Sequence, residues 1–177
     1  MSAERLLNVS SPTAGVSAIN VENVFTDDFE IYKIVSANLL GNNSTATAVN
    51  IRLINSSGTV IADNYQYAQR SMKAETSFSD NKSTDESRVW NYFNTIDDSA
   101  RSQGSYGFIF SPTSTTSYTY LQWHSIAMNG SDNVRSYIGV ASYPYLTKIT
   151  GFQVELNESA AEFAAGGTVK TYGLRVE

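Results

Sequence analysis

Apolar and polar residues alternate with a period of two along most of this chain, and this alternation constrains the fold more than any other feature. In segment 118–128, Leu121 and Trp123 lie on one face of an extended strand, and Tyr120 and Gln122 lie on the other. Such segments are short and are separated by Gly, Pro, Asn and Asp, as in antiparallel β-structure. The sequence therefore predicts eight or nine strands and less than about 15% helix.

The expected strands follow the alternating segments. Residues 59–67 should pair back on the strand before them through the turn at 55–58, and Asn129-Gly130 is the strongest hairpin signal. Residues 68–103 are interpreted as a long loop with one short helix, and residues 158–165 as one or two helical turns. The strands are expected at 16–25, 29–40, 49–53, 59–67, 104–110, 118–128, 134–142, 145–156 and 168–176.

Composition supports an all-β chain. Charged residues make up only 16%, and Ser, Thr and Asn together make up close to a third, which excludes a coiled coil or helical bundle. A hydrophobic content of 41% with 12% aromatics excludes a disordered chain. We expect an antiparallel β-sandwich, with a jelly roll as its arrangement and an immunoglobulin-like sandwich as the alternative. The expected core residues are Ile34, Leu53, Phe108, Phe110, Trp123 and Phe152.

The chain is expected to have two parts. Residues 1–15 end in a cluster of turn-forming residues and are interpreted as an N-terminal arm that orders against a neighbour. Leu6 and Leu7 would be the apolar anchors of this attachment arm. Residues 16–177 are expected to form one β-sandwich domain, since the length suits a single core.

Charge and cysteine content narrow the classes of partner. The net charge of −5 argues against nucleic acid and against an acidic membrane surface as partners. The chain has no cysteine, which removes disulfides and thiolate chemistry. No apolar run reaches the roughly 20 residues that span a bilayer, and no signal peptide is recognised at the start.

No catalytic constellation is recognised. His124 is the only histidine, and the carboxylate pairs at 27–28, 85–86 and 97–98 are adjacent in sequence, unlike the two separated carboxylates of a glycosidase. We therefore expect no enzymatic activity, no cofactor and no tightly bound metal. A weak calcium site on the Asp-rich turns is left open.

The segment around 118–124 carries the most informative surface pattern. Tyr118, Tyr120, Gln122 and His124 share one face of the expected strand. Tyr and His on a strand face suit a subunit interface or a platform for sugar binding. The alternative is that this face is a second buried sheet face, since aromatic residues also fill sandwich cores.

Several segments resemble small jelly-roll virion structural proteins of tailed bacteriophages. The resemblance covers residues 25–175 and consists of structural patterns, so it transfers no catalytic residue. The arm at 1–15 and residues 70–100 have no counterpart in it. The similar segments are Phe25-Thr26 through Phe29, Tyr32-Lys33-Ile34-Val35 with Asn38-Leu39, Ile51-Arg52-Leu53 with Ser57-Gly58, Tyr106 to Pro112, Ile149 to Phe152, and Phe163 with Gly167 to Lys170 and Tyr172 to Leu174.

The resemblance implies a non-enzymatic protein on the surface of a phage particle. A capsid decoration or cement protein is the expected role, with the chain itself, as a homotrimer, and other virion proteins such as the major capsid protein as partners. The alternative is a tail or fibre module that binds a host surface glycan.

Overall fold

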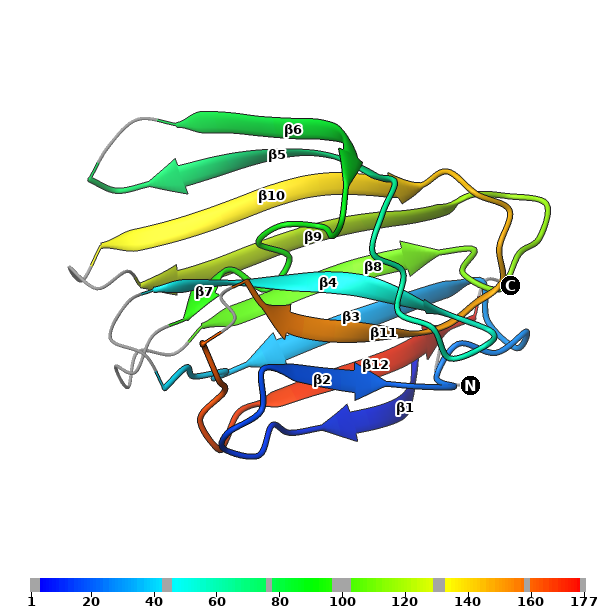
Figure 1. The fold of residues 1–177 in the computed structure, drawn as a ribbon, viewed down its shortest axis with the longest axis horizontal. Helices are drawn as coiled ribbons and strands as arrows, with labels where there is room; N and C mark the ends of the chain where they lie inside the picture. Colours follow the sequence, from blue (N-terminus) through cyan, green and yellow to red (C-terminus); the bar gives the residue numbers. More distant parts are fainter. Residues whose placement is uncertain are drawn as a thin grey trace.

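The computed structural model describes residues 4–42, 46–75, 78–96, 103–128, 133–157 and 160–175. These residues form twelve β-strands and no helix (Figure 1). The strands are β1 (Glu4–Ser10), β2 (Ala18–Val21), β3 (Ile31–Ala37), β4 (Thr47–Asn55), β5 (Tyr65–Lys73), β6 (Ser79–Glu86), β7 (Thr95–Ile96), β8 (Gly104–Phe110), β9 (Thr119–Met128), β10 (Val134–Tyr143), β11 (Ile149–Leu156) and β12 (Thr168–Leu174).

The strands build two sheets that pack face to face. The large sheet has eight strands in the order β1-β12-β3-β8-β9-β10-β5-β6, and the small sheet has four in the order β2-β11-β4-β7. In Figure 1 the small sheet lies in front of the large one. Each strand pairing in the described residues is antiparallel. The predicted all-β antiparallel sandwich is confirmed.

The core lies between the two sheets and is rich in aromatic side chains. Ile34, Leu53, Trp123 and Phe152 are buried, as predicted. The ring of Trp123 stacks on that of Tyr92 with 5.5 Å between the ring centroids. Alternation in each strand sends every second side chain into this layer, which is why the large sheet has one buried face and one open face.

The prediction that Phe108 and Phe110 of β8 lie in the core is wrong. Ile109 is buried, whereas Phe108 and Phe110 are half-buried and point away from the core. Gly107 determines which face of β8 turns toward the core, because a Cβ at that position would overlap the hydroxyl of buried Tyr92. Only a glycine lets the inner face of β8 approach that ring, so the two phenylalanines turn outward.

Residues 4–10 do not form a free arm. They form edge strand β1, which pairs with β12 from Glu4–Leu174 to Ser10–Val169, so the sheet begins before the expected domain boundary at residue 16. Leu7 packs against the core of its own domain. Leu6 is 50% exposed on the outer side of the sheet edge. The expected arm is corrected for these residues because their backbone pairs with β12 and extends the large sheet.

The region expected to be a loop contains a hairpin. β5 and β6 pair with each other at one edge of the large sheet, with Gln69 opposite Asn81. β5 also pairs with β10 rather than with β4, so the predicted return of 59–67 on the preceding strand is limited to the Ile54–Val60 bridge. Asn64 has a positive φ of 62° just before β5 and helps the chain turn toward the other sheet.

Two further turn predictions have different outcomes. Asn129 and Gly130 lie outside the described residues, although β9 and β10, the strands on either side, do pair as expected. Residues 158 and 159 are also outside the description, and residues 160–165 contain no helix. Phe163 instead forms bridges with Val16 and Gly41.

Candidate interaction surface on the large sheet

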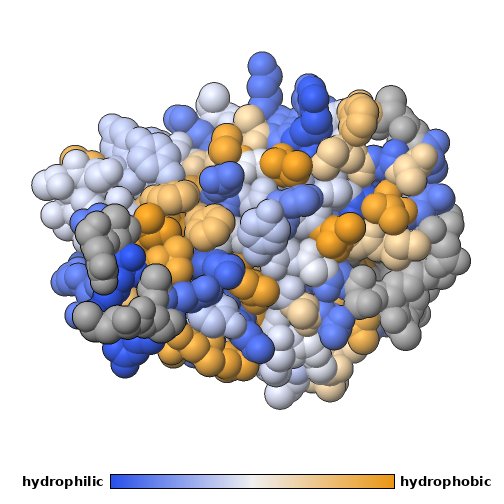
Figure 2. Space-filling view, turned by 180° about the vertical axis from the view of Figure 1, so that it is seen from behind, coloured by the Kyte–Doolittle hydropathy of each residue, from blue (hydrophilic) through white to orange (hydrophobic). Residues whose placement is uncertain are grey.

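The outer face of the large sheet presents a central area without charged residues. We call this area, formed by the outward positions of β8, β9 and β10, the uncharged face. Figure 2 views this side of the molecule and shows orange apolar side chains spread across it. Its members carry no Asp, Glu, Lys or Arg: Gly104, Tyr106, Phe108, Phe110, Tyr120, Gln122, His124, Ile126, Met128, Val134, Ser136, Ile138, Val140 and Ser142.

The predicted face of segment 118–124 is open to solvent. Tyr120 is 46% exposed, Gln122 is exposed and His124 is half-buried. Tyr118 is exposed just before β9 begins. Leu121 and Trp123 are buried, so the alternative of a second buried sheet face is excluded within this chain.

Sequence reasoning missed the part of the surface that β8 and β10 contribute. Ile138 and Val140 are 46% and 56% exposed on β10. Alternation alone gave no signal for them, because Tyr137 and Ala141 on the opposite face of β10 are also apolar. The buried partner of Gly139, the ring of Trp123, fixes which face turns inward, since a Cβ at Gly139 would overlap it.

Pairing register arranges these side chains in rows across the strands. One row is Phe108–Gln122–Val140 and the next is Tyr106–His124–Ile138. Side chains that lie opposite each other on one face of a sheet are close enough to pack. The ring centroids of Tyr106 and His124 are 5.7 Å apart within one row, and those of Tyr106 and Phe108 are 6.5 Å apart between the two rows, so the rows form a continuous surface.

His124 is held by two hydroxyl groups. Its Nε2 lies 2.9 Å from Ser136 Oγ, and its Nδ1 lies 3.4 Å from the Tyr106 hydroxyl. In a serine hydrolase the second ring nitrogen is oriented by a carboxylate, which stabilises the imidazolium that forms. Here a phenol occupies that position, so the contacts suit a side chain fixed on a sheet face.

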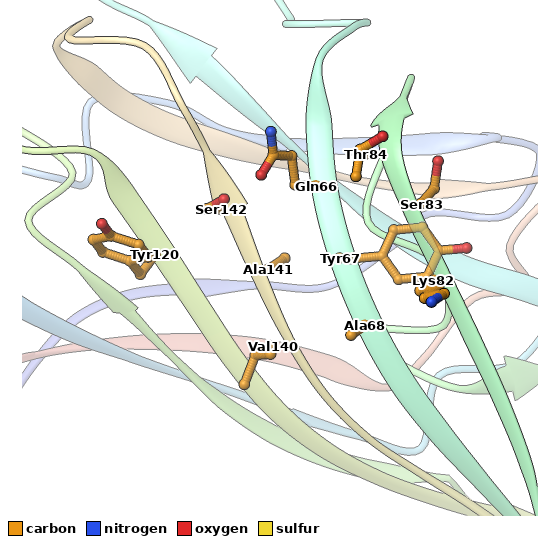
Figure 3. A pocket seen from close by; sticks show the side chains of 10 residues that line it. All are labelled: Gln66, Tyr67, Ala68, Lys82, Ser83, Thr84, Tyr120, Val140, Ala141 and Ser142. Atoms are coloured by element: carbon orange, nitrogen blue, oxygen red, sulfur yellow. The ribbon is translucent and has the colours of Figure 1, made fainter.

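A groove runs from the β10 side of the uncharged face toward the β5–β6 hairpin. Its volume is about 710 Å³, and the small side chain of Ala68 leaves space between Val140 and Lys82. A second groove of about 530 Å³ shares these three residues. Figure 3 shows the first groove with its lining residues from four neighbouring strands: Gln66, Tyr67, Ala68, Lys82, Ser83, Thr84, Tyr120, Val140, Ala141 and Ser142.

Charged side chains occupy the two margins of the outer face. On the margin formed by β1, β12 and β3, Lys33 Nζ lies 3.1 Å from Glu4 Oε1, and Lys170 projects from β12 on the same side. On the margin formed by β5 and β6, Arg70 Nε lies 2.8 Å from Asp80 Oδ1. Both signs are therefore present on each margin, while the centre carries none.

The small sheet carries a different cluster. Glu155 lies 3.0 Å from Arg52 and 2.9 Å from Arg88, and the Arg88 guanidinium lies over the ring of Trp90. Burial raises the pKa of the Glu155 carboxyl, although both guanidiniums oppose this shift. Arg52 Nε also donates to the carbonyl of Ser87. The cluster holds segment 86–90 on the small sheet and has the character of a structural ion network.

Two further kinds of site are absent from the residues that the structure describes. No group of three or more His, Asp or Glu side chains is placed to hold a metal ion there. None of the described segments is a helix long and apolar enough to cross a membrane.

Comparisons with known proteins assign the chain to no family. No family model and no curated protein matches the chain. A search of solved structures gave the CBM2 module of an evolved Dit from phage J-1 of Lactobacillus casei BL23, with a TM-score of 0.21 and 8% sequence identity. That match covers 90% of this chain and 69% of the other.

Proposed function

We propose that this protein is a non-enzymatic structural component of a bacteriophage particle and that it works through protein contacts on the outer face of its large sheet. The resemblance of residues 25–175 to small phage virion proteins supports the proposal that the protein belongs to a phage particle. The uncharged face supports the mode of action, and it is the observation on which the proposal depends. His124 and its hydroxyl partners have a structural role in this proposal.

The uncharged face has the anatomy of a protein interface. Interface centres are depleted in charge and enriched in aromatic residues, and their rims are polar. Here aromatic and aliphatic residues occupy the three central strands, and charged pairs lie at both margins. Isolated exposed apolar residues are ordinary on a protein surface, whereas a continuous patch marks an interaction site.

The specific role we propose is capsid decoration by a homotrimer on the particle surface, with the major capsid protein as a partner. Leu6 remains the candidate attachment residue because it is exposed at the edge of β1. Leu7 is no longer a candidate, since it packs in its own domain.

Purified protein added to capsids that lack it tests this role. We expect the wild-type chain to sediment with the capsids and Leu6→Asp to bind at least tenfold more weakly. Leu146→Asp is a matched control away from this edge strand, because Leu146 is 55% exposed in the loop between β10 and β11. Wild-type protein that stays in the supernatant at saturating capsid concentration would reject capsid decoration.

The alternative function is a tail or fibre module that binds a host glycan. The groove lined by Tyr120, Gln66 and Lys82 favours it, because its volume of about 710 Å³ lies in the range of ligand sites and it combines a ring with polar groups. Binding to host cells that is lost in Gln66→Ala, without binding to capsids, would favour the glycan role over decoration.

A further inference from the structure

We infer that the outer face of the large sheet packs against the same face of further copies of this chain, with the β5–β6 margin of one copy against the β1–β12–β3 margin of the next. This inference rests on the proposed function and names the partner of its surface. Four features of the outer face carry it: its aliphatic content, its uncharged centre, its charged margins and its area.

The aliphatic side chains at the centre fit a protein partner. Ile126, Ile138 and Val140 are each about half exposed, at 52%, 46% and 56%. A sugar can stack on a tyrosine ring, but its hydroxyl groups find no hydrogen-bond partner on isoleucine and valine. Unpaired polar groups in a contact cost free energy, whereas apolar side chains of another protein lose nothing there.

The absence of charge at the centre fits contact with identical copies. Residues near a symmetry axis meet their own equivalents, so a charged side chain there would face a like charge. The outward positions of β8, β9 and β10 contain none, although their flanking strands do. A partner of different sequence can meet a central charged residue with an opposite charge, whereas an identical copy at the axis cannot.

The two margins can pair with each other in a ring. The β1–β12–β3 margin carries Glu4, Lys33 and Lys170, and the β5–β6 margin carries Asp80, Arg70 and Lys82, so each margin holds an anion for a cation of the other. A contact between opposite margins can bring Glu4 of one copy to Lys82 of the next, and Lys170 to Asp80. Contacts between unlike patches generate a ring when the rotation between copies closes, and the ring that we propose has three copies.

The area is sufficient for a stable assembly. The five strands β3, β8, β9, β10 and β5 span about 24 Å, since adjacent strands lie about 4.8 Å apart. Strands of seven to ten residues are about 23–33 Å long at about 3.3 Å per residue. The resulting face is roughly 600–800 Å², and in a trimer its two neighbours share it, so the total area buried per copy is close to the roughly 800 Å² of one standard interface.

A substitution at the centre tests self-association. Val140→Asp places a charge where copies should meet, and the side chain is exposed, so the protomer should still fold. We expect native mass spectrometry to give a trimer for the wild type and a threefold lower mass for this variant. Leu146→Asp is the matched control, because Leu146 is 55% exposed in the loop between β10 and β11. A wild-type monomer would overturn the inference, as would a Val140→Asp trimer.

Cross-linking tests the arrangement of the margins. The chain has no cysteine, so a variant with Lys82→Cys and Lys170→Cys carries two defined thiols. Within one chain these positions are six strand spacings apart, about 29 Å, which a short bis-maleimide linker cannot bridge. We expect covalent trimers from the double variant on a denaturing gel and monomers from each single variant. Monomers from the double variant, or dimers from a single variant, would overturn the arrangement.

Capsid decoration and self-association are refuted by different results. Protein that forms the trimer but ignores capsids would refute decoration and leave self-association in place. Protein that is monomeric in solution but coats capsids would refute self-association and leave decoration in place. Binding of a soluble oligosaccharide that competes with trimer formation would assign the outer face to a glycan and also overturn the inference.

Discussion

Two buried tyrosines should contribute differently to stability, because only one of them has a hydroxyl group that is hydrogen-bonded among the described residues. The Tyr65 hydroxyl accepts a hydrogen bond from the Leu53 amide at 2.7 Å and donates one to the Ile61 carbonyl at 3.2 Å. The Tyr92 hydroxyl has no hydrogen-bond partner among the described residues. We therefore expect Tyr65→Phe to lower the free energy of unfolding by about 1–3 kcal/mol, because it leaves the Leu53 amide unpaired. Tyr92→Phe should leave it unchanged or raise it. Urea denaturation of both variants checks this, and equal losses would contradict it.

The same tyrosines predict a loss of stability at high pH. Burial raises the pKa of both phenols above the ordinary value of 10.0, so the folded state favours their neutral form. The stabilising effect is complete below pH 10 and decreases as the pH rises toward the folded-state pKa, because the unfolded chain ionises first. Tyr92→Phe should flatten the decline of the unfolding free energy above pH 10. A decline as steep as in the wild type would show that Tyr92 does not contribute.

Burial separates the ion pairs of this molecule into two groups. Glu155 is 7% exposed between Arg52 and Arg88, so Glu155→Ala leaves two partly buried cations without a partner. We expect this change to lower the free energy of unfolding by about 3–5 kcal/mol. Asp80→Ala is the control, because its pair with Arg70 is exposed to solvent and should contribute little to the free energy of unfolding. Similar losses from both changes in urea denaturation would contradict the distinction.

At the scale of elements, alternation predicted which segments become strands better than it predicted which way they face. The expected strand at 104–110 matches the bounds of β8, and segment 118–128 matches β9 to within one residue. The phase of β8 depended on Gly107 and on the Tyr92 ring, which is distant in sequence. The local sequence pattern contains no information about such a contact, so it predicts Phe108 and Phe110 for the core, although both face outward.

The candidate surface was predictable only in part for the same reason. Tyr120 and Gln122 could be placed on one face from β9 alone. Their neighbours Phe108 and Val140 come from β8 and β10, and only the pairing register brings them into one row. A surface built across strands becomes visible once the order of the strands is known.

The edge strand β1 should stabilise the sheet without being required for folding. It is paired on one side only, with β12, and Leu7 packs against the core. Deleting residues 4–10 removes hydrogen bonds worth roughly 1 kcal/mol each and exposes the edge of β12. We expect a folded protein with a lower denaturation midpoint and a greater tendency to aggregate. A midpoint equal to that of the intact chain would mean that β1 is detached in solution.

At the scale of the whole molecule, β12 is the interior strand that joins the two ends of the chain in the large sheet. It lies between β1 and β3, so the C-terminal strand separates two strands from the N-terminal part of the chain. Its buried residues Val169 and Thr171 face the core, and Gly173 lies against the ring of Phe29. Sheets that depend on pairings between distant segments fold slowly, in milliseconds to seconds, because loop closure precedes the contacts that offset it.

Removing β12 should therefore have a far larger effect than removing β1. Deletion of residues 168–175 leaves β1 without a partner and uncovers the edge of β3, while the core loses one wall. We expect loss of the cooperative unfolding transition, since a single domain has no smaller unit that buries a comparable core. Far-UV circular dichroism with urea titration measures this, and deletion of edge strand β6, residues 79–86, is the control that should keep a transition. A cooperative transition in the chain without β12 would show that the remaining strands form an independent folding unit.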